Sequence, residues 1–406
     1  MSPSVPPEGA PDPASTAGAP PKSAPLRSLV AVLLSAFGVG LMMGVSLPLI
    51  SLLLESRGYA DSVIGLNAAA YSLAILVTCP FVPGVAARIG TVGTLVVGTV
   101  AVAGALLAFP SAEGLVALFG LRLVIGVGTA LIWIASETWV TRLPAESRRG
   151  RIIAIYATLW GSGMAAGPAL LSLVGTEGRA PFVVAALMIA LAYAPAVAVR
   201  RTVPAVAERG RPLRLIAALG VAPVGLLAGF LSGFGEGALF SLFAVYGLAA
   251  GLTATTAVLL TTVFAAGGIA LQPPTGWLAD RVDRFGLLIA TVVVAMLAAV
   301  AMPAAVGHPV AVWPVLFLFG GAVAGFYTLG LILIGEAFSG GDVAAGNTAF
   351  IMTYTLGGIA GPAAGGGAMD LWPPHGLMAV LALAAAAFLP VAFALRRRAR
   401  PAAPAE

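Results

Sequence analysis

Long apolar runs, separated by short clusters of charge, constrain this chain more than any other feature of its sequence. Of the 406 residues, 60% are hydrophobic and only 9% are charged, whereas a soluble domain needs about a quarter of its residues charged. A helix needs about 20 apolar residues to cross the hydrocarbon core of a bilayer. Because backbone groups there must be paired within the segment, the pattern predicts an all-α integral membrane protein.

The apolar runs divide into twelve predicted spans in two groups of six. The first group comprises residues 29–54, 63–82, 92–109, 115–140, 152–174 and 181–199. The second comprises residues 215–247, 255–278, 287–306, 311–337, 345–369 and 376–395. We therefore expect two six-helix bundles, over residues 26–200 and 215–398, joined by a basic connector over 201–214.

The two ends of the chain are expected to be cytoplasmic tails. Residues 1–25 are rich in Pro, Ala and Ser and contain no apolar stretch, which predicts a disordered tail without a removable signal peptide. Residues 399–406 form the second tail. With the N-terminus inside, 18 of the 21 basic residues lie on the cytoplasmic side, and only Arg57 and Arg179 lie outside. Because positive charge marks the cytoplasmic side, we predict a multi-pass protein of a bacterial-type inner (plasma) membrane.

Sequence features recur between the two groups. Segment 126–137 begins with Gly and ends with Glu, and segment 325–336 does the same at an offset of 199. The pattern Gly-x-x-x-Gly-Pro at 163–168 recurs at 357–362. Duplicated six-helix halves with a substrate site between them are typical of secondary transporters.

Several of these motifs resemble signatures of the major facilitator superfamily. They are the loop Gly276-Trp-Leu-Ala-Asp280-Arg281 and the run Arg122-x-x-x-Gly126. The run 357–366 resembles an antiporter signature, although it lies in the eleventh predicted span instead of the fifth. The stretch 133–137 resembles the bacterial YcaD-like branch. The resemblance covers nearly the whole chain after residue 25, and it implies a transporter with two pseudo-symmetric bundles around a central cavity.

The resemblance also implies a gate on the cytoplasmic side. Acids placed like Glu137 and Glu336 pair with arginines of the nearby loops, here Arg88 and Arg281. Asp280 is implied to face a helix N-terminus, where a carboxylate is stabilised. Since Ala87 occupies the matching first-half position, the gate should be carried mainly by the second half. Proton coupling or plain structural pairing are the alternatives for the two glutamates, and a solvated loop charge is the alternative for Asp280.

Two charged residues within the spans are candidates for the transport site. Glu236 lies in Ser232-Gly-Phe-Gly-Glu236-Gly, where nearby glycines weaken the helix and a buried carboxylate suits proton binding. An acid satisfied by a neighbouring Ser, Thr or Tyr is the alternative. Arg122 is the only basic residue within a span, and Gly321 takes its place in the second half. It is a candidate for holding an anionic substrate or for tuning Glu236, or else a structural Arg bonded to backbone and hydroxyl groups.

Aromatic and amide side chains of the spans could line the cavity that the resemblance implies. Helical spacing places Arg122, Gly126, Thr129 and Trp133 on one stripe. The candidates are Asn67, Tyr71, Tyr156, Tyr354 and Trp133, with Trp160 and Tyr327 beside them. Helix packing or membrane-interface anchoring is the alternative for each of them.

The sequence predicts a secondary transporter and no enzyme. It has no nucleotide-binding Gly-x-x-x-x-Gly-Lys run, nucleophile elbow or metal-ligand cluster, so we expect no cofactor, no metal and no nucleic-acid partner. We predict a monomer that exports a small organic solute by alternating access, with protons as the partner ion. The alternatives are a proton-linked importer or facilitator of a small organic anion, a lysolipid-type flippase and, more distantly, a non-transporting sensor.

Overall fold

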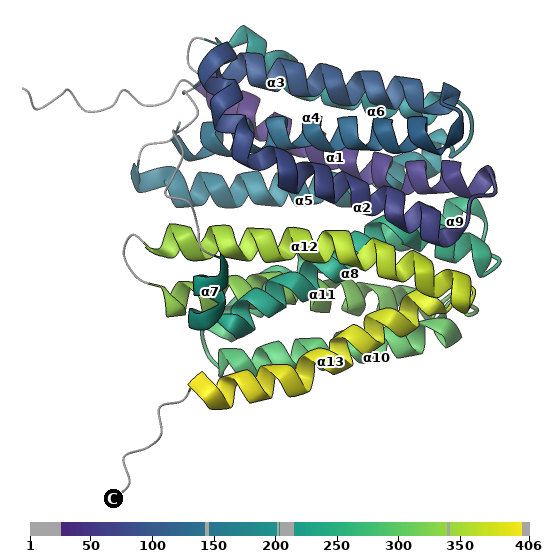
Figure 1. Ribbon diagram of the computed structural model, residues 1–406, viewed down its shortest axis with the longest axis vertical. Coiled ribbons are helices and arrows are strands. Elements are labelled where there is room, and N and C mark those ends of the chain that lie inside the picture. Colours follow the sequence, from purple (N-terminus) through teal and green to yellow (C-terminus); the bar gives the residue numbers. More distant parts are fainter. Residues whose placement is uncertain (1–25, 143–145, 201–202, 204–214, 339–341, 400–406) are drawn as a thin grey trace, which may run out of the picture.

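The computed structural model describes residues 26–142, 146–200, 203, 215–338 and 342–399. In these ranges, twelve helices of 18 or more residues run side by side in two halves, which Figure 1 shows one above the other. The first half comprises α1 (Leu26–Ser56), α2 (Asp61–Thr78), α3 (Val82–Ala108), α4 (Gly114–Arg142), α5 (Glu146–Val174) and α6 (Ala180–Ala198). The second comprises α8 (Pro223–Ala249), α9 (Ala254–Ala279), α10 (Arg284–Ala305), α11 (Val312–Ala337), α12 (Asp342–Leu371) and α13 (Gly376–Ala399). The predicted fold class is confirmed.

The helices have the apolar surface that a membrane requires. Among the described residues, ten segments are long and apolar enough to cross a bilayer, and one of them, Asp61–Ser111, contains both α2 and α3. Large apolar side chains such as Val116 and Leu173 are more than four-fifths exposed. Helix α12, rich in Gly, Ala and Thr, is not among the ten segments. It packs against α2 of the other half as well as α8, α11 and α13, and this interior position explains its lower hydropathy.

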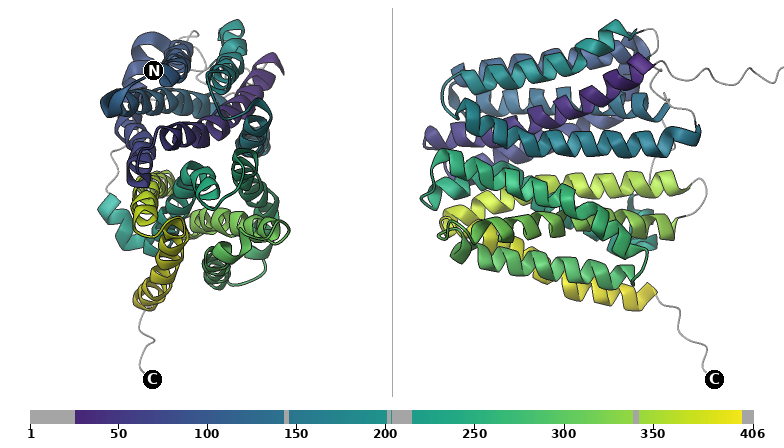
Figure 2. Two further views of the ribbon diagram at one scale, coloured as in Figure 1. Left: turned by 90° about the vertical axis from the view of Figure 1, so that its right-hand side faces the viewer. Right: turned by 180° about the vertical axis from the view of Figure 1, so that it is seen from behind.

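The two ends of the bundle differ in charge. One end, which we call the basic end, carries the described arginines Arg27, Arg88, Arg151, Arg200, Arg281, Arg284 and Arg396. The opposite end, which we call the far end, carries Arg57 and Arg179. Both helix α1 and helix α13 have their outer termini at the basic end (Figures 1 and 2). The predicted connector and tails lie outside the described residues, apart from residue 203 and residue 399.

The seventh predicted span was wrong at its start. Residues Leu215–Val221 form a separate short helix, α7, and α8 begins only at Pro223. Ala222 between them has non-helical φ of −132° and ψ of 55°. Because proline has no amide hydrogen and clashes with the preceding turn, it begins a new helix here. Helix α8 then continues through Glu236 without a break, so the glycines around Glu236 do not interrupt it.

The loop at 276–281 and the corresponding first-half segment at 83–90 turn the chain by different means. In the first half, the residues after α2 are already helical, because α3 begins at Val82 and kinks at Gly90. Gly90 has a φ of 76°, a conformation that residues with a Cβ atom rarely adopt. In the second half, Asp283 accepts a hydrogen bond from the Gly286 amide and caps α10. The side-chain cap formed by Asp283 thus begins α10, whereas in the first half the chain turns at Gly90.

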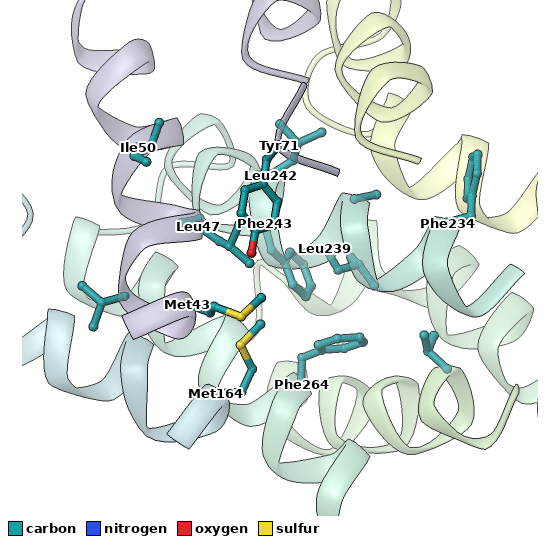
Figure 3. Packing of buried hydrophobic residues seen from close by; sticks show 14 of the residues in the cluster. Met43, Leu47, Ile50, Tyr71, Met164, Phe234, Leu239, Leu242, Phe243 and Phe264 are labelled. Atoms are coloured by element: carbon teal, nitrogen blue, oxygen red, sulfur yellow. The ribbon is translucent and has the colours of Figure 1, made fainter. Parts of the chain in front are cut away.

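Glycine lets the helices that carry the repeated motif approach their neighbours closely. A Cβ atom on Gly357 or Gly361 of α12 would collide with the α8 backbone at Phe230 or Phe234. Gly163 and Gly167 of α5 pack on α1 in the same way. The halves meet through α2 with α12, α5 with α9, and α1 with α8. Figure 3 shows the apolar cluster to which both halves contribute, for example Met43 and Leu47 from α1, and Leu242 and Phe243 from α8.

Candidate functional site

One face of α4 is buried at the far end and exposed at the basic end. Arg122 and Thr129 are only 1% and 2% exposed, whereas Trp133, one helical turn further, is 36% exposed. Glu137 follows on the same stripe and is also exposed. Tyr327 of α11 lies near Glu137, so the basic-end part of this stripe faces the other half. Its far-end part packs on α2 of the same half, where Gly126 meets Tyr71 and Ala74.

The basic-end portions of α5 and α9 are exposed as well. None of residues 151–162 of α5 and none of residues 269–274 of α9 is buried. Helices α5 and α9 touch near their middles, where Gly161 faces Ile269. Between the halves, side chains are thus accessible from the basic end.

The halves are joined at the far end. The carboxylate of Asp370, near the end of α12, accepts hydrogen bonds from two backbone amides at the start of α2. The distances are 2.9 Å from the Asp61 nitrogen and 3.1 Å from the Ser62 nitrogen. One turn further along α2, Gly65 packs directly on Pro362 and Gly366. A carboxylate at a helix N-terminus is favoured by the unpaired amides and by the helix dipole, so this contact joins the two halves at the far end.

Glu236 lies in the middle of α8 and is held by two hydroxyl groups. Tyr354 Oη donates to Oε2 at 2.7 Å, and Ser232 Oγ lies 3.2 Å from Oε1. Ser232 Oγ is also 3.3 Å from the carbonyl oxygen of Val323. Since a serine has one hydroxyl proton, it can donate either to Glu236 or to Val323. Among the described residues, Glu236 forms no ion pair.

The first half has no equivalent of Glu236. Gly40 of α1 packs on the backbone of Trp160, as Gly233 of α8 packs on the backbone of Tyr354. Three residues after each of these glycines come Met43 and Glu236, respectively. The pseudo-symmetry of the halves therefore places a thioether opposite a carboxylate, and the acid is specific to the second half.

Arg122 lies against the ring of Tyr71 and forms no ion pair with a described acid. Its guanidinium carbon is 5.1 Å from the centroid of the Tyr71 ring. None of its three guanidinium nitrogens has a hydrogen-bond partner among the described residues. Tyr71 Oη and Thr129 Oγ1 lie close to each other and have no other such partner. Tyr71 is close enough to Tyr354 to interact electrostatically, but no described contact joins Arg122 to Glu236. Among the described residues, the structure therefore shows no direct contact through which Arg122 could have the predicted influence on Glu236.

The other predicted cavity residues have different surroundings. Asn67 is buried, and its amide donates to the carbonyl oxygen of Leu118 at 3.3 Å, so it joins α2 to α4. Tyr156 is half-buried near Glu137. Tyr327 packs edge-on against Tyr354 at 5.5 Å between ring centroids. The tyrosines of α11 and α12 thus surround Glu236, while Asn67 belongs to the packing of the first half.

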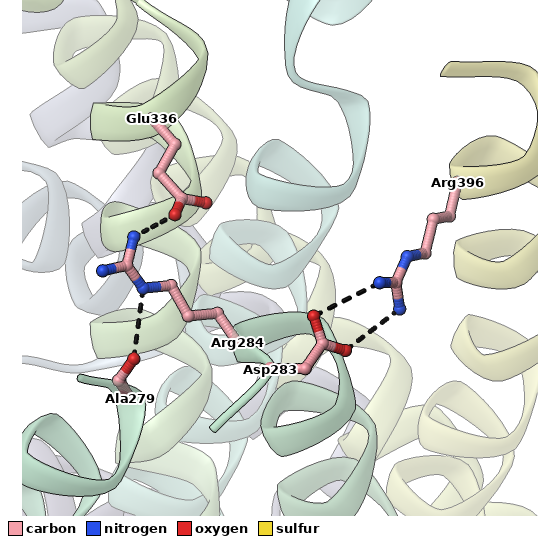
Figure 4. A network of polar contacts seen from close by, with 5 residues as sticks. All are labelled: Ala279, Asp283, Arg284, Glu336 and Arg396. Carbon is pink, nitrogen blue, oxygen red and sulfur yellow. Dashed lines mark hydrogen bonds and ion pairs between the residues drawn. The ribbon is translucent and has the colours of Figure 1, made fainter. Parts of the chain in front are cut away.

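The predicted gate residues lie at the basic end, but their partners differ from those expected. Glu336 forms an ion pair with Arg284, not with Arg281 (Figure 4). The Arg281 guanidinium stacks on Trp277, 3.9 Å from the ring centroid. Among the described residues, Arg88, Glu137 and Asp280 form no ion pair. The predicted pairing of Arg88 with Glu137 is therefore not formed in this conformation, which is accessible from the basic end.

A second ion pair, which the sequence did not indicate, lies beside the first. Asp283 and Arg396 are bidentate, with both N–O distances at 3.2 Å (Figure 4). The Gly286 amide and then Arg396 hold the pKa of Asp283 below its usual range. The two pairs line a cavity of about 490 Å³ that is built from second-half helices alone, so it lies apart from the interface between the halves. Asp283 before a helix is a recognisable cap signal, but nothing in the sequence pairs it with Arg396.

Comparison with known proteins agrees with this architecture. The model of the Major Facilitator Superfamily matches the chain twice, over residues 32–224 and 225–406. The uncharacterized MFS-type transporter YfkF of Bacillus subtilis (strain 168) is 28% identical over 349 residues, 85% of this chain and 89% of that protein. The uncharacterized MFS-type transporter YcaD of Escherichia fergusonii is 28% identical over 245 residues, but the match spans only 59% of this chain and 62% of that protein. The crystal structure of a mutant of the nucleoside transporter NupG superposes with a TM-score of 0.74 at 13% identity, covering 92% of this chain and all of that one.

Proposed function

We propose that this chain, which belongs to the major facilitator superfamily, exports a small organic solute in exchange for protons. Its relatives YfkF and NupG are named as transporters, so we take it to be a transporter and not an enzyme. The two six-helix halves would rock about the interface between them, exposing it to one side of the membrane at a time. The basic end would face the cytoplasm, in a bacterial-type inner membrane. The protein would act as a monomer. The solute would bind between its two halves, beside Trp133, Tyr156 and Tyr354.

The exposure of the interface supports alternating access. The halves are joined at the far end through Asp370 and the start of α2, while the α4 stripe is exposed at the basic end. This is the arrangement expected of a conformation that receives solute from the cytoplasm. In the opposite conformation, Arg88, Glu137, Asp280, Arg281 and Glu336 would approach one another and close the basic end.

The surroundings of Glu236 carry the proposal of proton coupling. When Glu236 is ionised, it accepts hydrogen bonds from Tyr354 and from Ser232. When it is protonated on Oε1, it can donate to Ser232 Oγ, because the serine proton can turn to the Val323 carbonyl oxygen. Both protonation states of Glu236 thus keep their hydrogen bonds, so neither state leaves a buried polar atom of the carboxyl group without a partner. Such a site can load and release a proton during each cycle.

Proton release from inverted vesicles tests this function. An acid interior is imposed, a compound library is added, and a pH-sensitive dye follows the gradient. We expect some compounds to collapse the gradient only when the protein is present. Glu236→Gln should abolish this response while the protein stays folded and inserted, and Glu113→Gln, an exposed acid at the far end, should retain it. Proton movement that persists in the Glu236→Gln variant would refute the assignment.

The second candidate is a proton-linked importer or facilitator of a small organic anion. The observation that favours it is the buried and unpaired guanidinium of Arg122. An importer would move protons in the same direction as the solute. The vesicle experiment separates the two functions, since an exporter acidifies the compartment that loses solute and an importer does not.

A further inference from the structure

Arg122 and its neighbours form a cluster of buried polar groups around an unpaired guanidinium. The guanidinium of Arg122 is 1% exposed, and all three of its nitrogens lack hydrogen-bond partners among the described residues. The hydroxyls of Tyr71 and Thr129 are also buried; they lie close to each other and have no other hydrogen-bond partner among the described residues. Burying a cation without a counter-charge is costly, and the ring of Tyr71 at 5.1 Å compensates only in part. The cluster therefore favours an incoming anion.

No described residue supplies the missing negative charge. The two ion pairs of the described chain lie at the basic end, in the second half. Glu236 is bound by Ser232 and Tyr354. Glu137 lies on the same stripe as Arg122, but fifteen residues along a helix separate the two by roughly 22 Å. Asn67 of α2 directs its amide to the carbonyl of Leu118.

We propose that Arg122, Tyr71 and Thr129 bind the oxyanion group, carboxylate or phosphate, of the transported solute. This inference rests on the proposed transport function and names its substrate class as organic anions. A guanidinium presents paired N–H groups that match two oxygens of a carboxylate or phosphate. The two hydroxyls add donors of their own. Because Gly321 replaces Arg122 in the other half, the interface has one such anion site and not two.

The site is connected to the exposed part of the interface by one helix face. Thr129 is one turn of α4 from Trp133, which is accessible from the basic end. Because the Tyr71 ring lies 5.1 Å from the guanidinium carbon, this side chain would have to move before an anion could reach Arg122. The apolar part of the solute would then lie against Trp133, which offers a large apolar surface.

Ligand-induced thermal stabilisation of the purified full-length protein tests the inference without any proton gradient. The probes are benzoate, phenyl phosphate and benzamide at matched concentrations, because benzamide has the shape of benzoate without its charge. Binding to the native state raises the melting temperature by mass action. We expect benzoate or phenyl phosphate to raise it and benzamide to leave it unchanged, and the better anion identifies the preferred oxyanion. Arg122→Gln should weaken anion binding about 10- to 100-fold, the loss expected for hydrogen bonds to a charged group.

A matched pair of variants covers the case in which Arg122→Gln fails to fold. Thr129→Val removes a buried hydroxyl of the site. Thr328→Val removes its counterpart in α11, whose hydroxyl already donates to the Ala324 carbonyl. Only Thr129→Val should weaken anion binding. Equal stabilisation by benzamide, no stabilisation by either anion, or equal effects of the two threonine variants would overturn the proposal. Since no proton movement is measured, failure of this test is distinct from failure of Glu236→Gln in vesicles.

Discussion

At the scale of single residues, the cap of α10 makes stability depend on pH. Asp283 accepts a hydrogen bond from the Gly286 amide at 2.8 Å and pairs with Arg396. Both contacts favour the ionised carboxylate and lower its pKa. A group with a lowered folded-state pKa stabilises the fold above its unfolded-state pKa, and this contribution is lost as the pH falls through the folded-state pKa. For Asp283 the loss begins near its ordinary pKa of 3.8.

We predict that Asp283→Ala lowers the free energy of unfolding by about 1 kcal/mol at neutral pH, the usual cost of losing an N-cap. The ion pair adds little, because both side chains are substantially exposed. Below about pH 4 the difference between the two proteins should shrink, since the Asp283 carboxylate is then protonated in the unfolded chain and, at still lower pH, in the folded protein as well. Thermal unfolding across this pH range measures both effects. A difference that is constant with pH would contradict the role of the charge, and the exposed Glu113→Ala provides the baseline.

At the scale of helices, glycine sets the distance between α8 and α12. A Cβ atom at Gly361 would collide with the backbone of Phe234, whereas a Cβ atom at Gly367 of the same helix would meet nothing within 4 Å. We predict that Gly361→Ala destabilises the second half by about 1–3 kcal/mol, the cost of forcing packed helices apart. Gly367→Ala should be neutral or stabilising by up to about 1 kcal/mol, because alanine favours the helix. Unfolding curves of the two variants check this, and similar curves would show that the close approach has no energetic role.

Helices were the most predictable level of this structure. Ends at 114–142 or 376–399 follow from charge and turn residues that bound an apolar run. Leu215–Val221 and α8 could not be separated, because the apolar run is continuous across Ala222 and only Pro223 marks the break. In the candidate site, helical spacing correctly placed Arg122 and Trp133 on one stripe. The partner of Glu336 could not be predicted, since Arg281 and Arg284 are both near enough in sequence and only packing selects between them.

At the scale of the whole molecule, contacts between the halves decide which side of the interface is open. Asp370 and the start of α2 are separated by 309 positions in the sequence, so nothing in the local pattern indicates their contact. It joins a carboxylate of the second half to free amides of the first. Because these amides have no partner within their own helix, they would have to bind water once the far end opens and the contact breaks. The free-energy difference between the two conformations therefore includes this contact directly.

We predict that Asp370→Ala shifts the conformational equilibrium toward opening at the far end by roughly 1–2 kcal/mol, a factor of about 5–30. Asp370→Asn should have a smaller effect, since its carbonyl oxygen still accepts one hydrogen bond. A Ser72→Cys reporter, placed where Ser72 faces Gly358 across the interface, would measure the shift by its rate of maleimide labelling. Cys79 is the only native cysteine, so Cys79→Ser gives a clean background.

The control for this prediction is Glu113→Ala, which removes an acid from the same end without touching the contact between the halves. If labelling at Ser72→Cys rises in Asp370→Ala and not in the control, the helix cap formed by Asp370 contributes to closure. Unchanged labelling would mean that the glycine packing of Gly65 on Pro362 and Gly366 holds the far end by itself. In that case the balance of the two conformations is set by van der Waals contact between small residues, and charge at the far end has no part in it.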